Sequence, residues 1–222
     1  MEEKKKPTKY EKWFKFLRGV ERFILRPLFP YKKHGNLQKY NSNYIVVCNH
    51  YRIWDVLYPV CVTDQPVHYM GKSNLWKNKL FGKFLDKCQA ICVNRDGNDA
   101  KALMQSMRYL KNKEVVALFP EGTRNKTDEP FLPFKSGATL MSIRTKSPII
   151  PIIQVKKAKI FRKADIIIGE PIEFSEYYDK KPTEEQILEC DEKLMNKMLE
   201  IRTNFLAEKE AQKQEKKRKK KK

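Results

Sequence analysis

The sequence has no apolar run that approaches the ~20 residues a helix needs to cross a bilayer. It also lacks a signal-peptide pattern of basic, apolar and small-residue regions. We therefore expect an intracellular protein that does not cross a membrane as a simple helix. Cysteine and histidine are scarce: the five cysteines form no CxxC pair, and the three histidines show no zinc-site spacing. This composition favours reduced core thiols and predicts no metal site.

Acidic residues are too few to balance the basic ones, which gives 47 Lys and Arg against 27 Asp and Glu and a net charge of +20. Residues 209–222 contribute +7, from nine basic and two acidic residues, and residues 2–27 contribute +5, from nine and four. An excess at the two ends indicates an anionic partner, either phospholipid or nucleic acid. The aromatic residues cluster on apolar helix faces instead of alternating with Lys and Arg, so we expect no nucleic-acid partner.

Short apolar runs rich in β-branched and aromatic residues predict the strands of an α/β fold. Helical stripes lie between them, which predicts a mostly parallel central sheet flanked by helices. Pro151 indicates that its strand is at an edge of the sheet or is bulged. Thr183 and Gln186 form a capping box for a closing helix. The predicted strands are residues 44–48, 67–70, 90–93, 115–119, 149–155 and 166–168.

The charge pattern divides the chain into three predicted regions. Residues 1–30 form a basic amphipathic membrane-associating helix, residues 31–208 form the main domain, and residues 209–222 form a disordered polybasic tail. The first region has two interpretations: its apolar side lies in a membrane interface, or it packs on the protein's own sheet. We expect the interface, because aromatic residues beside Lys and Arg suit the headgroup level. That apolar side comprises Trp13, Phe16, Leu17, Val20, Phe23 and Ile24.

The most informative stretch directly follows the strand predicted at residues 44–48. His50 lies where this strand ends, and ligands collect beyond the carboxyl ends of strands in open α/β sheets. Asp55 is close enough to accept a hydrogen bond from one ring nitrogen, which leaves the other nitrogen free as a base. Taken alone, a histidine beside an aspartate is more often a capped or core residue.

Three cations follow other predicted strands: Lys72, Arg95 and Arg124. In a parallel sheet they would converge with His50 on one edge, and three cations beside a base describe a site for a phosphorylated substrate. Gly122 would let the backbone approach a bound group closely, and neighbouring amides would donate to an anion.

Two motifs resemble those of one enzyme family. Asn49-His50 followed by Asp55 resembles the NHxxxxD motif of the PlsC-type glycerolipid acyltransferases, and residues 119–124 match their FPEGTR motif. The likeness extends over about residues 43–172. Two further segments resemble other motifs of that family: residues 91–95, although Asn94 stands where Asp is common, and the proline-containing segment 148–152.

The resemblance implies transfer of a fatty acyl group from acyl-CoA or acyl-carrier protein to the sn-2 hydroxyl of lysophosphatidic acid (1-acylglycerol 3-phosphate). The product would be phosphatidic acid, made in phospholipid biosynthesis at the cytoplasmic face of an anionic phospholipid membrane by a peripheral or monotopic protein. His50 would be the general base and Asp55 its support. The residues that would bind or position the acceptor are Lys72, Arg95, Glu121, Gly122, Thr123 and Arg124.

The resemblance requires no metal and no bound cofactor beyond the thioester co-substrate. Because the sequence has no GxSxG nucleophile elbow, we expect direct transfer instead of a serine acyl-enzyme. The alternatives are another lysophospholipid or glycerol 3-phosphate as acceptor, or a membrane-bound scaffold that has lost activity.

Overall fold

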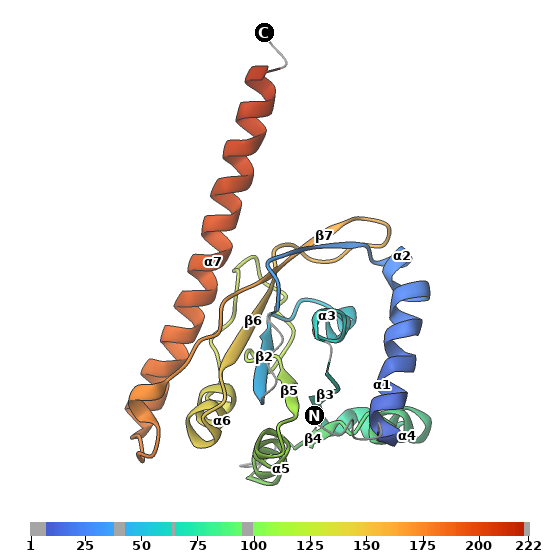
Figure 1. The fold of residues 1–222 in the computed structure, drawn as a ribbon, viewed down its shortest axis with the longest axis vertical. Helices are drawn as coiled ribbons and strands as arrows, with labels where there is room; N and C mark the ends of the chain where they lie inside the picture. Colours follow the sequence, from blue (N-terminus) through green and yellow to red (C-terminus); the bar gives the residue numbers. More distant parts are fainter. Residues whose placement is uncertain (1–7, 38–42, 64, 95–99, 220–222) are drawn as a thin grey trace, which may run out of the picture.

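The computed structural model describes residues 8–37, 43–63, 65–94 and 100–219. In these ranges seven strands form one sheet in the order β1-β7-β6-β2-β5-β3-β4 (Figure 1). Each neighbouring pair is parallel except β6 with β7, which confirms the predicted mostly parallel sheet. The strands are β1 (Tyr31–His34), β2 (Tyr44–Cys48), β3 (Val67–Lys72), β4 (Ile91–Val93), β5 (Val115–Leu118), β6 (Ile149–Gln154) and β7 (Ala164–Ile168).

Helices cover both faces of the sheet. Buried residues of α5, α6 and α7 join the core on one face, and residues of α1 and α3 join the core on the other. The α-helices are α1 (Lys9–Val20), α2 (Arg26–Leu28), α3 (Leu57–Val62), α4 (Lys79–Lys87), α5 (Ala100–Lys111), α6 (Gly137–Thr145) and α7 (Glu184–Lys219). The shorter helical segments are the π-helical η1 (Glu21–Leu25) and the 3₁₀ segments η2 (Ile53–Val56), η3 (Ser73–Lys77) and η4 (Ser175–Tyr177).

The apolar runs of the central strands are continuous because both faces are buried. In β2, Ile45 and Val47 face the core formed with α5, α6 and α7, whereas Val46 and Cys48 face the core formed with α1 and α3. This alternation is the period of two that a strand imposes on its side chains. A strand buried on both faces has no polar side, which is why the sequence shows an unbroken hydrophobic run.

The expectation of an edge strand at Pro151 is wrong, because β6 lies between β2 and β7. The structure shows instead the alternative of a bulge. Ile152 pairs with Ile168 and Ile149 bridges to Ile172, so three steps along β6 match four along its partner. Gly169 N donates to Pro151 O on this irregular side (2.9 Å). Proline has no backbone N–H to donate. Because the Pro151 backbone faces the interrupted β6–β7 pairing, the missing donor removes no regular ladder hydrogen bond.

The N-terminal helical segment packs on the domain through residues outside its predicted apolar side. Tyr10 and Phe14, which that prediction did not include, are buried against the domain. Of the predicted side, Phe16, Phe23 and Ile24 are exposed, and Trp13, Leu17 and Val20 are partly exposed. Burial of one side means that the segment packs as part of the domain. The exposed side has no covering element among the described residues, so the membrane interpretation remains a prediction.

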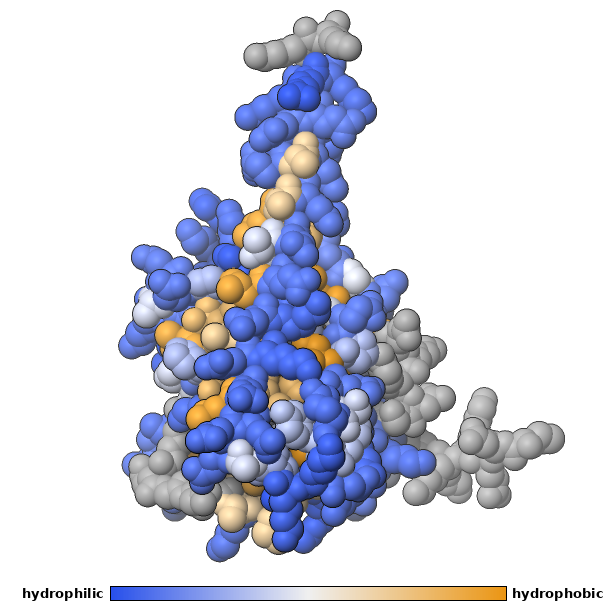
Figure 2. Space-filling view, turned by 90° about the vertical axis from the view of Figure 1, so that its left-hand side faces the viewer, coloured by the Kyte–Doolittle hydropathy of each residue, from blue (hydrophilic) through white to orange (hydrophobic). Residues whose placement is uncertain are grey.

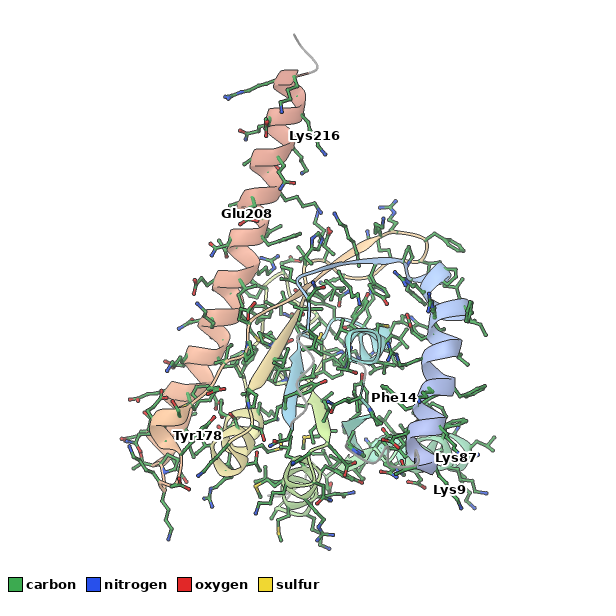
Figure 3. All side chains as sticks on the ribbon, in the orientation of Figure 1. Lys9, Phe14, Lys87, Tyr178, Glu208 and Lys216 are labelled. Carbon is green, nitrogen blue, oxygen red and sulfur yellow. The ribbon has the colours of Figure 1, made fainter. Side chains whose placement is uncertain are left out.

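The structure also differs from the predicted disordered tail, because α7 continues to Lys219 (Figure 3). Alanine, glutamate, glutamine, lysine and arginine are all strong helix formers. The pairs Lys213–Glu210 and Lys219–Glu215 add support at helical spacing. At Lys209, where the predicted tail begins, α7 is bound to β7 by the Lys209–Asp165 ion pair. Its projecting part is mostly hydrophilic on the side shown in Figure 2.

One strand and one α-helix in the described ranges had no counterpart in the sequence prediction, namely the four-residue strand β1 and the helix α6. β1 pairs with β7 and so extends the sheet beyond the antiparallel strand. None of the helices in the described ranges combines the length and the apolar composition needed to cross a bilayer.

Candidate active site

Asn49 connects the end of β2 to the end of β6. Its Nδ2 donates to Gln154 O (3.1 Å), and its Oδ1 accepts from Gln154 N (2.8 Å). The side chain thus makes the two bonds that a paired backbone would make, and it is fully buried. This contact fixes the direction in which the chain leaves the strand, immediately before His50. The sequence interpretation gave Asn49 no role of its own, although the residue stands within the motif.

His50 and Asp55 form the predicted pair. Nδ1 of His50 lies 3.2 Å from Oδ2 of Asp55, and the same oxygen accepts from the backbone N–H groups of Tyr51 (2.5 Å) and Arg52 (2.6 Å). Asp55 is fully buried, whereas 17% of the His50 side chain is exposed. An ionised Asp55 only accepts hydrogen bonds, so Nδ1 carries the proton and Nε2 is left as the basic nitrogen.

The ring of His50 is also held from the side. It stacks on the ring of Phe119 with the centroids 3.9 Å apart and the planes at 15°. Phe119 follows β5 directly, and β5 is the neighbour of β2. The first residue of the FPEGTR motif therefore orients the histidine of the other motif.

Glu121 locks the two loops together. Its Oε1 accepts from His50 N (2.8 Å), and its Oε2 accepts from Leu132 N (2.9 Å). Asn125 N donates to His50 O (2.6 Å), so both sides of the His50 backbone are bound to the loop after β5. Burial raises the pKa of the Glu121 carboxyl, although the two backbone donors oppose this shift. With both oxygens engaged, the geometry favours the positioning role predicted for Glu121 over direct contact with a phosphate.

The remaining FPEGTR residues form a tight turn. Gly122 has φ +64°, and a Cβ there would lie 3.0 Å from Cδ and Cε of Lys135. A side chain would therefore be both strained and crowded. Thr123 and Arg124 are exposed at this turn. Lys135 is a further cation beside it, which the sequence interpretation missed because it lies outside every motif.

The predicted cations come from neighbouring strands. Ala117 of β5 pairs with both Val46 and Tyr69, so His50 and Lys72 leave the same edge of the sheet three to four residues later. Lys72 is exposed at the end of β3. Adjacent strands are about 4.8 Å apart, which places the two backbones about 10 Å from each other across β5. Arg95 lies outside the described residues.

A basic cavity of about 440 Å³ opens beside this edge. Tyr51, the residue after His50, forms part of its wall. Nζ of Lys157 donates to Thr127 O (3.1 Å) and lies 5.7 Å from the centre of the Tyr51 ring. Such a cavity suits a phosphate-bearing molecule. Its charged lining is Lys156, Lys157, Lys159, Arg162, Lys163 and Arg202, with Asp128 and Glu129.

No group of three or more His, Cys, Asp and Glu side chains suited to a metal ion occurs in the described ranges. The described residues present a supported histidine base at the same edge of the sheet as Lys72, Arg124 and Lys135. That combination can remove a proton from a hydroxyl group of a phosphorylated molecule.

A sequence profile of the acyltransferase family matches residues 30–155, which is more than half of the 222 residues. The chain belongs to the acyltransferase family. The matched span contains the His50–Asp55 pair and the whole FPEGTR turn. It leaves out α1 and α7, so those elements are described by their own sequence and contacts.

Individual relatives extend the similarity. The 1-acyl-sn-glycerol-3-phosphate acyltransferase of Bacillus subtilis is 29% identical over 180 residues, which are 75% of this chain and 88% of that protein. The Escherichia coli protein of the same name is 28% identical over 202 residues, 84% of this chain and 80% of that protein. Among solved structures, the LPA acyltransferase PlsC from Thermotoga maritima covers 86% of this chain and 76% of its own, with a TM-score of 0.57 and 21% identity. The acyltransferase family and this fold therefore agree.

Proposed function

We propose that the protein transfers a fatty acyl group from a thioester to the sn-2 hydroxyl of 1-acylglycerol 3-phosphate and so makes phosphatidic acid. The observation that carries the proposal is the His50–Asp55 pair, held against the FPEGTR turn by Glu121. The curated names of the relatives from B. subtilis and E. coli support this acceptor.

The proposed reaction uses Nε2 of His50 as the base. Nε2 takes the proton of the acceptor hydroxyl as its oxygen attacks the thioester carbonyl carbon. The resulting tetrahedral intermediate collapses, the C–S bond breaks, and the leaving thiolate takes the proton back from the imidazolium. Asp55 stabilises the imidazolium through the Nδ1 contact of 3.2 Å. A positioned base of this kind contributes about 10²–10⁴-fold to a rate.

The acceptor phosphate is bound by cations in this proposal. Lys72 and Arg124 are exposed on the His50 edge of the sheet, and Lys135 lies against the turn at Gly122. Arg95 is proposed for the same role from its motif. Guanidinium groups match phosphate oxygens in pairs, whereas lysine acts as a point charge. The donor is acyl-CoA or acyl-carrier protein, and no metal or bound cofactor takes part in the proposed step.

The proposal includes a peripheral or monotopic position on the cytoplasmic face of an anionic membrane. The exposed side of the N-terminal segment supports it: Phe16 is 58%, Phe23 77% and Ile24 58% exposed, and basic residues alternate with them. Apolar side chains among cations are typical of a helix in the headgroup region. None of the five cysteines, all of which lie in the described ranges, is part of a disulfide, as in a reducing compartment.

The test is a substrate panel with the purified full chain. Labelled acyl-CoA and acyl-carrier protein are each offered with lysophosphatidic acid, other lysophospholipids and glycerol 3-phosphate, and products are identified by mass spectrometry. We expect phosphatidic acid as the dominant product. A different dominant product would replace the proposed acceptor, and the absence of transfer with every pair would reject the proposed function.

A further inference from the structure

The connection between β6 and β7 ends in an unusual turn. Arg162 N donates to Lys159 O (3.1 Å), so Ile160 and Phe161 form the two-residue tip. Phe161 has φ +57°, a conformation that glycine and asparagine adopt much more readily than a bulky residue. Ile160 is 60% exposed and Phe161 74% exposed. The tip therefore combines backbone strain with two exposed apolar side chains, neither of which favours the folded chain in water.

This turn adjoins the exposed side of the N-terminal segment. Phe161 N donates to Leu28 O (2.8 Å), and Ala164 N donates to Pro30 O (2.9 Å). Leu28 is itself partly exposed and lies one helical turn after Ile24. Figure 1 shows the β6–β7 connection beside α2. The turn thus adds its apolar tip to a surface that begins on η1 and α2.

The residues that flank the tip are all basic or small. Residues 156–163 contain five Lys or Arg and no acidic residue. An apolar tip between cations matches a bilayer surface, because the tip enters the acyl boundary while the cations meet anionic headgroups. The same cations line the cavity beside Tyr51. Contact at this turn would therefore bring the cavity and the His50 edge to the lipid headgroups.

We propose that the Ile160–Phe161 turn is a second membrane anchor, which inserts into an anionic bilayer next to the N-terminal segment. This proposal rests on the proposed function for its purpose, since it delivers a lipid acceptor to His50. Its evidence is separate, namely the exposure, the turn geometry and the charge of residues 156–163.

The experiment compares the full chain with the Ile160→Ser/Phe161→Gly variant in sedimentation with vesicles of phosphatidylcholine and phosphatidylglycerol. We expect at least ~10-fold weaker partitioning of the variant into the vesicles, because the two apolar side chains that would be buried in the bilayer are removed. Its thermal stability should be unchanged or higher, because glycine relieves the positive φ. Met104→Ser, at an exposed apolar residue on α5, is the matched control and should bind as the wild type does.

Equal vesicle binding by wild type and turn variant would overturn the proposal, as would an equal loss in the Met104→Ser control. Binding of a second copy of the chain, instead of a bilayer, to the Ile160–Phe161 turn would also overturn the proposal. That result would appear as self-association of the wild type without lipid that the turn variant lacks. Transfer to a soluble short-chain lysophosphatidic acid separates the two hypotheses: a wild type without that activity rejects the proposed function, while the vesicle comparison still decides the anchor.

Discussion

His50 is held by more contacts than its ring chemistry alone would need. Asp55 accepts from its ring, Glu121 accepts from its backbone N–H, and Phe119 stacks against its face. Two of these three residues come from the loop after β5. A base fixed in this way needs little reorganisation when the proton moves, which is the main requirement for a preorganised site.

Replacing Asp55 by asparagine tests the support of the base. Asparagine keeps an oxygen for the backbone N–H groups of Tyr51 and Arg52, but it carries no charge to stabilise an imidazolium. We expect kcat for acyl transfer to fall by about 10²–10⁴-fold with little change in KM. Asp179→Asn is the control, since Asp179 is exposed and pairs with Lys146 away from the site. A variant Asp55→Asn with wild-type kcat would remove Asp55 from the mechanism.

Glu121→Gln tests the lock between the loops. Glutamine has one acceptor oxygen for two backbone donors, so we expect a loss of about 1–3 kcal/mol in the free energy of unfolding at pH 7, together with a lower kcat.

The pH dependence of that difference follows from the raised pKa of Glu121, which burial causes. A raised carboxyl pKa means that protonation of Glu121 favours the folded state. The stability gained from this protonation is fully present below pH 4.5, the ordinary pKa of the carboxyl, and it is lost as the pH rises through the raised pKa. The wild type should therefore lose stability over that window relative to the variant. Urea unfolding across pH 4 to 8 measures it, and parallel pH profiles would contradict the assignment.

At the scale of elements, the N-terminal segment has a packed side and an exposed side. Deleting the whole segment would also remove the buried Tyr10 and Phe14, so it cannot isolate membrane contact from folding. Phe23→Ser/Ile24→Ser changes only exposed residues. We expect this variant to keep the wild-type melting temperature and to sediment less with anionic vesicles. If it sediments as the wild type does, the interfacial interpretation of this segment fails.

The elements differ in how well their sequence predicts them. β2 and β5 were predictable because strands buried on both faces leave continuous apolar runs. β1 was not, since Tyr31-Lys32-Lys33-His34 has one buried residue and gains its order from pairing with β7. The end of α7 was misread because strong charge also indicates disorder, whereas here Glu–Lys spacing favours a helix.

The same contrast holds for the site. The His50–Asp55 pair was predictable because it follows a predicted strand and resembles a family motif. Glu121 was expected only from the resemblance of residues 119–124 to the FPEGTR motif. Five of the six cavity cations form a basic run within residues 156–163, which is visible in the sequence. That this run lies beside Tyr51, and that Lys135 lies against Gly122, follows only from the fold. Sequence spacing carries no signal for such tertiary neighbours.

At the scale of the whole molecule, the parallel strands place the proposed catalytic, phosphate-binding and membrane-binding residues at one edge of the sheet. The ends of β2, β5 and β3 carry the base, the FPEGTR turn and Lys72. The end of β6 carries the basic cavity and the Ile160–Phe161 turn, which contacts the N-terminal segment. A lipid acceptor held at a bilayer would thus meet cations and base on the same side of the protein.

The most direct test of this account is acyl transfer to lysophosphatidic acid by wild type and His50→Ala, assayed side by side with equal thermal stability as the folding control. The account predicts phosphatidic acid from the wild type and a rate at least ~10²-fold lower from the variant, because the general base is lost. Full activity without His50 would contradict the central claim.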